Sequence, residues 1–567
     1  MVQPFSLLSE PWIPVLRADG ARDMVRPAAI TSEVTTNPVI APAWGRADFD
    51  AATREFWIGL LSTACGRQAD DDGDGWEEWF RSPPTPEVLD AAFAPLASAF
   101  MLDGDGPRFG QDLNDFAGES VNVSQLLIEA PGANTVKRNL DHFVHRGGVE
   151  TLSRAGVAIA LFTLQTYAPS GGAGHRVSVR GGGPLTTLLV PGDLRGDSRE
   201  LPSPLWRTLW LATPHRDPVA PARIFPWLEP TRVSDKGKTT TDSDVDKLQA
   251  FWGMPRRIRL LFEPNLDCSR CDLTGRMDDT IVRTYRTRPH GTSYVAFQHP
   301  LSPHYRAKPT DPFLPLHGQP GRIGYRHWVG LVVNDILATT TPPLRQVAEA
   351  IETGRRRLDD LESGARAGAR LLAAGYDMDN MKAREFIESE MPLPLVERVR
   401  FASYDRIVRR LVAGAREAEG IARLFVRQAL FVKRTQMQDG FTKAPKGGGA
   451  LDLARARFWE RTEAGFGQAL AKLSDDLSID GADPETAGQA AAQSRLVTLR
   501  DTALAIFDEL VSLEDLDALD ERSARARIEA RNDLHGALRG FGKLGQSLFG
   551  ALDLATPDVV KKRKAVA

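Results

Sequence analysis

Residues Tyr167–Thr187, YAPSGGAGHRVSVRGGGPLTT, contain two glycine clusters that flank a short cationic segment. The clusters are Gly171–Gly174 and Gly181–Gly183, and Arg176 and Arg180 lie between them, where valines alternate with serine as in a short strand. Glycine adopts positive φ and lets another backbone come close, at an entropic cost. The pattern fits a hairpin with two glycine turns, and it equally fits a surface on which a polyanion approaches the main chain.

Length and composition indicate a multidomain globular protein. At 567 residues the chain exceeds what one hydrophobic core usually serves, so we expect at least two domains. The net charge is −3, so any nucleic-acid contact requires locally basic surface. No apolar run approaches the roughly 20 residues of a membrane helix, and the N-terminus does not resemble a signal peptide. We therefore expect a cytoplasmic protein.

The three cysteines argue against a disulfide scaffold and fit a reducing compartment. Cys268 and Cys271 have the spacing of a zinc knuckle but supply only two ligands. His142 and His145 offer a second pair, so a His₂Cys₂ zinc site is one hypothesis. The alternative is a pair of reduced cysteines and two unrelated histidines.

The sequence divides near Pro392. Residues 1–392 read as a mixed α/β domain, in which we expect a helix over 52–66, a strand over Leu126–Ile128, and helix from 343 through Tyr376. A polar turn, Asp377–Lys382, follows that helix in this prediction, and Pro392 and Pro394 mark the boundary.

Residues 393–556 have helical periodicity almost throughout, with turn signals between the helices. We predict an antiparallel four-helix bundle with helices at about 396–418, 420–436, 451–474 and 488–513, and a fifth at about 524–550 that completes or caps it. Arginines crowd its first half, either as a solvated surface or as a face that follows phosphates. Residues 557–567 form a basic tail that we expect to be disordered.

Motifs of common enzyme classes are missing from the sequence. It contains no GxSxG elbow, no HExxH and no complete P-loop. The chain is therefore predicted to be a binding module rather than an enzyme.

Several segments together resemble one family. They are FSLLSEPWIPV at the start, the helix and glycine stretch through Thr187, FQHPLSP at Phe297–Pro303, AAGYDMDN at Ala373–Asn380, and ARARFWERTEAGF in the bundle. In this order they look like the large subunit of the type I-E CRISPR surveillance complex (Cascade), the CasA family. The resemblance covers nearly the whole chain and implies an α+β fold: a large mixed N-terminal domain followed by a C-terminal antiparallel four-helix bundle.

The resemblance also implies a function. Members of this family are non-catalytic, bind the guide RNA (crRNA) and the other Cascade subunits, and read the protospacer-adjacent motif (PAM) of double-stranded DNA from the minor groove. They start R-loop formation by wedging open the first base pairs and help to recruit the helicase-nuclease. Protein reads the short motif while base pairing reads the rest.

The family's functional elements match particular positions here. Its glycine loop corresponds to Ser170, Gly171, Gly172, Ala173 and Gly174, its cationic finger to Arg288, and its wedge to Asp379, Asn380 and Met381. Its loop that docks on the RNA handle and the neighbouring subunits corresponds to Gly132–Arg146, with Asn134, Lys137, Arg138 and Asn139 as contacts.

Three departures from the family pattern bear on the chemistry. Ala173 stands where some members have glycine, Arg288 where they have lysine, and Asn380 where glutamine is frequent. One of two Cys-x-x-Cys zinc pairs found in some members aligns with Ser153 and Gly156, so the zinc site is either lost or completed by the two histidines. The resemblance requires no cofactor, and a structural zinc is the one candidate.

Two other classes remain open at this stage. One is a zinc-stabilised RNA-binding scaffold without DNA readout, and the other is a metal-dependent nuclease.

Overall fold

The computed structural model describes residues 4–70, 75–141, 144–193, 202–333, 345–359, 361, 365–366, 368–379, 381–431, 449–512 and 519–557. It divides into two compact units. Unit 1 comprises 1–323, 330–365 and 370–390, and unit 2 comprises 324–329, 366–369 and 391–567. The main division lies two residues from the predicted boundary at Pro392, but two short segments upstream of it also belong to unit 2. The basic tail lies outside the described residues, apart from its first residue.

Helix α1 (Ala47–Ala64) carries the core of unit 1. It begins five residues before the helix predicted at 52–66 and ends two residues earlier than predicted. Phe56 is fully buried, and its ring meets five other aromatic rings nearly edge-on at centroid distances of 5.4–6.0 Å. Edge-to-face pairs of this kind stabilise beyond their buried area. The rings around Phe56 are those of Trp12, Phe100, Phe109, Phe162 and Trp252.

Small antiparallel sheets surround this core. β1 (Ile13–Arg17) lies between β2 (Arg22–Val25) and β3 (Val39–Pro42). β8 (Thr280–Arg288) pairs with β7 (Arg257–Pro264) along its length, and on its other edge with β4 (Glu119–Asn122) and β5 (Leu152–Ser153). A third sheet has the order β10 (Leu314–Pro315), β9 (His304–Tyr305), β11 (Arg345–Gln346).

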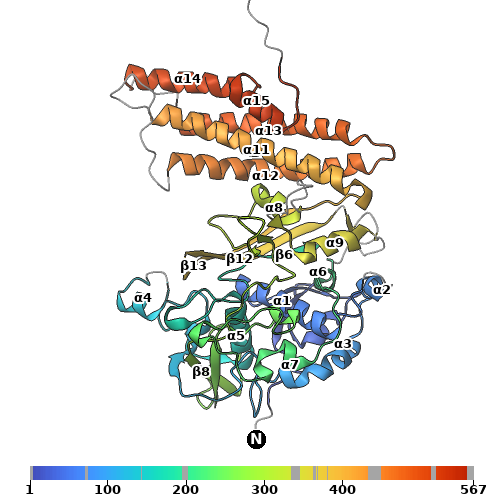
Figure 1. Cartoon of the computed structure of the whole chain (residues 1–567), viewed down its shortest axis with the longest axis vertical. Coiled ribbons are helices and arrows are strands. Elements are labelled where there is room, and N and C mark those ends of the chain that lie inside the picture. The colour runs from blue at the N-terminus through green and yellow to red at the C-terminus, as the bar shows by residue number, and fades with distance from the viewer. Residues whose placement is uncertain are drawn as a thin grey trace, which may run out of the picture. The chain divides into compact units, whose positions relative to one another are not determined.

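The fourth sheet corrects the predicted helix. In the described part of 345–376, α9 (Glu349–Asp359) and residues 365–366 are helical, whereas β12 (Arg370–Asp379) and β13 (Lys382–Pro392) are strands next to β6 (Thr186–Val190). Figure 1 shows β6, β12 and β13 side by side. Residues 371–377 are buried throughout, and a strand buried on both faces loses the alternation that distinguishes it from a helix.

Two smaller strand predictions are also wrong. Residues 175–180 form no strand, and the apolar run Leu126–Ile128 follows a 3₁₀ turn (Val123–Leu126) instead of forming one. The remaining helices of unit 1 are α2 (Gly75–Arg81), α3 (Pro86–Phe93), α4 (Ala133–Lys137), α5 (Arg154–Tyr167), α6 (Leu205–Leu211), α7 (Pro221–Ile224) and most of α8 (Trp328–Val332).

Unit 2 is a helical bundle built around α11 (Phe401–Leu430), against which the other long helices pack. One 30-residue helix therefore replaces the first two predicted helices, because Gly420 has helical dihedrals and does not interrupt it. The predicted fifth helix is two helices. Figure 1 shows the long helices running alongside one another. They are α12 (Ala450–Leu477), α13 (Pro484–Leu510), α14 (Glu521–Ala537) and α15 (Gly542–Ala551).

The segment 324–329 joins the bundle core through Tyr325. The Tyr325 hydroxyl lies 2.7 Å from the Thr462 Oγ1, and its ring stacks on Phe466 at 4.6 Å. Arg495, which is 1% exposed, places its guanidinium 4.9 Å from the Tyr325 ring centroid. This buried aromatic and cationic cluster explains why the segment belongs to unit 2.

A buried ion pair connects α1 to the glycine-rich stretch of unit 1. Glu55 on α1 pairs with Arg180, and both side chains are 2% exposed. Glu55 also accepts hydrogen bonds from Tyr167 (2.6 Å) and Thr186 (2.5 Å). The Glu55 carboxylate on α1 and the Arg180 guanidinium in the glycine-rich stretch neutralise each other. The ion pair therefore fixes the stretch against the helix.

Glu55→Ala should therefore destabilise the protein by about 3–5 kcal/mol, because it leaves the Arg180 guanidinium buried without a counter-charge. The measurement is the shift in the urea unfolding midpoint. Glu77→Ala, which removes the exposed α2 pair to Arg81, is the control and should cost under about 1 kcal/mol. Equal shifts for the two variants would contradict this role of the buried pair.

Candidate nucleic-acid interface

The glycine loop Ser170–Gly174 presents main chain at the surface of unit 1. It follows α5, and Gly172–Gly174 form a 3₁₀ turn. Ser170 and Gly172 are exposed, and no atom lies within 4 Å of a Cβ built on Gly172. Gly174 has φ +84°, and a Cβ there would lie 2.7 Å from the His290 ring. The loop shape thus requires glycine at 174, while its outer surface is left open.

A half-buried cation, Arg256, lies under this loop. A Cβ on Gly171 would come within 2.7 Å of the Arg256 Nη1, and Arg256 donates from Nη2 to the Pro169 carbonyl oxygen. Within the described residues Arg256 has no ion pair and its Nε has no hydrogen-bond partner. Burial lowers the pKa of Arg256 to about 10, so the side chain stays charged at neutral pH. A fixed positive charge thus lies directly behind the loop.

Sequence reasoning missed Arg256. The one feature that could have pointed to this residue is its position immediately before strand β7, which begins at Arg257. Several other arginines also lie next to strands, so this position does not single out Arg256.

Strand β8 carries the predicted cationic finger. It holds three arginines: Arg283 pairs with Glu263 and Asp267, and Arg286 pairs with Asp115. Arg288 forms no ion pair among the described residues and lies 5.5 Å from the Phe116 ring centroid. Of the three, Arg288 is therefore the one whose charge is not already neutralised by a carboxylate.

A backbone hydrogen bond joins this strand end to the glycine loop. Two residues after Arg288, the amide of His290 donates to the Gly174 carbonyl oxygen at 3.0 Å. His290 has φ +63°, and this turn directs the chain from β8 to the loop. The structure thus brings the glycine loop and the end of β8 together, as the family resemblance implies.

The predicted wedge lies at the end of the β12–β13 hairpin. Asp379 ends β12, Lys382 begins β13, and Asn380 lies outside the described residues. Asp379 is exposed, and the Met381 side chain is 51% exposed although it is apolar. The turn was predicted at this position, but it connects two strands instead of ending a helix.

The second glycine cluster anchors this hairpin. A Cβ on Gly183, which has φ +63°, would lie 2.7 Å from the Tyr376 Cβ on β12. The Tyr376 hydroxyl donates to the Asp48 Oδ2 at 2.7 Å. The two glycine clusters therefore hold two different elements, the end of β8 and the hairpin.

The docking loop contains a short helix that the sequence reading did not predict. Asn134 and Lys137 lie on α4, and Arg138 and Asn139 follow it; all four are exposed. Asn139 has φ +50° and accepts a hydrogen bond from Arg146 (3.0 Å), which closes the loop. Lys137 and Arg138 form no ion pair within the described part of the chain.

The predicted zinc ligands do not converge where the structure describes them. Cys268 and His145 are exposed, whereas the Cys271 thiol is buried, 2.9 Å from the position of a Cβ on Gly156. His142 lies outside the described residues, and the described ones contain no cluster of three metal ligands. Zinc binding therefore stays a prediction, and the positions of Cys268, Cys271 and His145 do not favour it. Cys271 does face Gly156, one of the positions aligned with the missing cysteine pair.

The bundle arginines are largely tied to acids. Arg406 and Arg410 pair with Glu485, and Arg423 with Glu419. These pairs favour the solvated-surface interpretation of the first half of the bundle.

Among the described residues no helix is both long and apolar enough to cross a membrane.

Comparison with known proteins identifies the family. The model of CRISPR-associated protein Cse1 matches residues 6–506, and the chain belongs to this family. CasA (Cse1) of Thermus thermophilus superposes with a TM-score of 0.64 at 17% identity, covering 94% of this chain and 100% of that one. Cse1 of Thermobifida fusca gives 0.66 at 17% identity, covering 98% and 99%.

A chain of a CRISPR RNA-guided surveillance complex also shares the fold, with a TM-score of 0.61 at 18% identity over 94% of this chain and 99% of that one. No curated protein matches the sequence. The predicted α+β class with a helical C-terminal region is confirmed by these superpositions.

The geometry of the glycine loop predicts that an added methyl group lowers the stability of the protein at Gly174 but hardly changes it at Gly172. Gly174→Ala should destabilise the protein by about 1–3 kcal/mol, because the residue has positive φ and its Cβ meets the His290 ring. Gly172→Ala, which faces open space, should stay within about 0.5 kcal/mol. Thermal unfolding of both variants checks this expectation, and a larger loss at Gly172 would refute the loop geometry.

Proposed function

We propose that this chain is a non-catalytic subunit of a CRISPR RNA-guided surveillance complex. In that complex it reads the protospacer-adjacent motif of double-stranded DNA from the minor groove, wedges open the first base pairs and helps to recruit the helicase-nuclease. Membership of the Cse1 family supports the assignment to such a complex, with guide RNA and the other Cascade subunits as partners. The DNA-reading role rests on the arrangement of unit 1.

One observation carries that role: a single stretch, Tyr167–Thr187, holds both the end of β8 and the β12–β13 hairpin. An exposed glycine main chain permits close approach of a DNA groove. Arg288 adds a cation that has no carboxylate partner in the described part of the chain, and arginine favours a narrow, electronegative minor groove. The exposed Met381 at the hairpin end is an apolar group of the type that inserts between base steps.

Arg288→Ala should weaken binding of the reconstituted complex to motif-bearing DNA by about 10-fold or more, because it removes a charged contact of roughly 1.5–3 kcal/mol. Arg283→Ala is the matched control on the same strand. Its charge is already paired with Glu263 and Asp267, so it should change affinity by less than about 2-fold. Affinity is measured by gel shift at fixed salt, and equal losses for the two variants would argue against a specific finger.

Asn380→Ala tests the wedge. The variant complex should bind a target whose first protospacer pairs are mismatched open as well as wild type does, and should bind the closed duplex about 10-fold more weakly, because opening one pair costs a few kcal/mol. Glu385→Ala, an exposed change further along β13, is the control and should alter neither.

The exposed Lys137 and Arg138 favour a second candidate, an RNA-binding scaffold without DNA readout. If that were the whole function, Asn380→Ala would be silent on every DNA target. Loss of Lys137 and Arg138 together would instead abolish assembly with the guide RNA. The double change Lys236→Ala and Lys238→Ala removes the same charge from another exposed segment and serves as the control in the assembly assay.

A further inference from the structure

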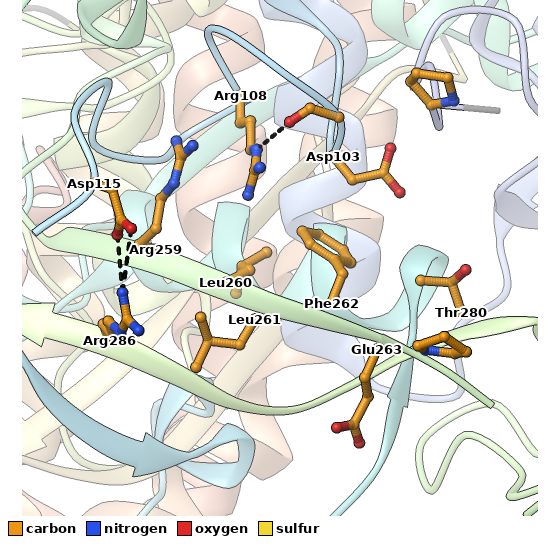
Figure 2. A pocket seen from close by; sticks show the side chains of 13 residues that line it. Asp103, Arg108, Asp115, Arg259, Leu260, Leu261, Phe262, Glu263, Thr280 and Arg286 are labelled. Carbon is orange, nitrogen blue, oxygen red and sulfur yellow. Dashed lines mark hydrogen bonds and ion pairs between the residues drawn. The ribbon is translucent and has the colours of Figure 1, made fainter. Parts of the chain in front are cut away.

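A separate pocket in unit 1 is lined by strand β7, the segment around Asp103–Arg108, and parts of β8. Its volume is about 500 Å³, within the usual range for small-molecule sites. None of the glycine loop, Arg288 or the hairpin end lines it. Figure 2 shows the side chains that do.

Two guanidinium groups in this pocket have no carboxylate partner among the residues that the structure describes. Arg108 donates from Nε to the Gly104 carbonyl oxygen at 2.8 Å, and Arg259 donates from Nη1 to the Asp112 carbonyl oxygen at 2.9 Å. Neither forms an ion pair among the described residues. In Figure 2 both side chains extend into the space on one side of β7. Burial and the nearby charge of Arg108 lower the pKa of Arg259, and the charges of Asp115 and Asp112 only partly oppose this.

Two of the three acids that line the pocket are paired with arginines: Asp115 with Arg286 at 3.1 Å, and Glu263 with Arg283. Asp103 accepts a hydrogen bond from the Phe5 amide at 2.6 Å and forms no ion pair among the described residues. The two guanidinium groups therefore outnumber the one carboxylate left without an ion pair, and two adjacent cations favour an anion between them.

An aromatic ring lies on the same side of the pocket. The pairing of β7 with β8 is irregular beside it, because Arg283 of β8 is an extra residue opposite the step from Leu261 to Phe262. Figure 2 shows Phe262 and Arg259 on the same side of the strand, facing Arg108. The pocket thus combines the guanidinium groups of Arg108 and Arg259 with the flat apolar ring of Phe262.

We propose that this pocket binds a nucleoside monophosphate, with its phosphate between Arg108 and Arg259 and its base against Phe262. Guanidinium forks match phosphate oxygens with bidentate geometry. An aromatic ring provides a stacking surface that tolerates any base. The proposal goes beyond the DNA-reading role and does not depend on it.

Isothermal titration of the full-length chain tests the proposal with three probes: 5′-AMP, inorganic phosphate and adenosine. We expect 5′-AMP to bind at least about 10-fold more tightly than either fragment, since it alone supplies both contacts. Arg108→Gln should weaken 5′-AMP binding by about 10-fold or more. Phe262→Leu keeps apolar volume but removes the ring, so it should weaken 5′-AMP binding and leave phosphate binding unchanged.

Arg270→Gln is the matched control, because Arg270 also donates to a glycine carbonyl, that of Gly275 at 2.9 Å, and is exposed away from the pocket. It should bind 5′-AMP as wild type does. The proposal is overturned if 5′-AMP shows no binding at about 10 mM. It is also overturned if phosphate binds as tightly as 5′-AMP, or if Arg108→Gln and Arg270→Gln behave alike. Circular dichroism confirms that each variant is folded before titration.

Discussion

The ion pair between Glu55 and Arg180 is the constraint on which the rest of unit 1 depends. A buried charge is tolerated only when its partner and the remaining hydrogen bonds are in place. Arg180 also donates to Thr186 (2.9 Å) and Ser302 (3.1 Å), so α1, the glycine-rich stretch and the segment of Ser302 must all meet correctly for the pair to be satisfied. Because Arg180 lies between the two glycine clusters, fixing it fixes both clusters.

From that fixed point the glycines take different roles. The Gly174 carbonyl oxygen accepts a hydrogen bond from the His290 amide and so positions the end of β8, whereas Gly183 lets Tyr376 of the hairpin approach the main chain. Arg256, which forms no ion pair within the described ranges, places its charge behind the first cluster. The glycine-rich stretch therefore acts as a scaffold for neighbouring elements as well as an exposed surface.

A second polar network extends from the hairpin toward the docking loop. Tyr376 donates to Asp48, Arg46 pairs with Asp48 at 2.8 Å, and Arg46 also pairs with Glu129 at 2.7 Å. Glu129 lies three residues before Gly132, where the docking loop begins. The hairpin and this loop are thus both held against the start of α1 by directed, charged contacts.

From the sequence alone we predicted the helical C-terminal region, the helix around Phe56 and a turn within Asp377–Lys382, because glycine, proline and helical periodicity act locally. The α+β class followed from the mixed pattern of residues 1–392 together with the family resemblance. The tertiary structure was needed to show that β12 and β13 are neighbouring strands, since β12 is buried on both faces and its sequence lacks alternation.

The tertiary structure was also needed to show which arginines have acidic partners. Arg283, Arg286 and Arg288 look alike in sequence, and among the described residues only the first two pair with acids. The position of Arg256 behind the glycine loop and the proximity of Arg108 to Arg259 could not be predicted for the same reason, since charge compensation depends on neighbours that are distant along the chain.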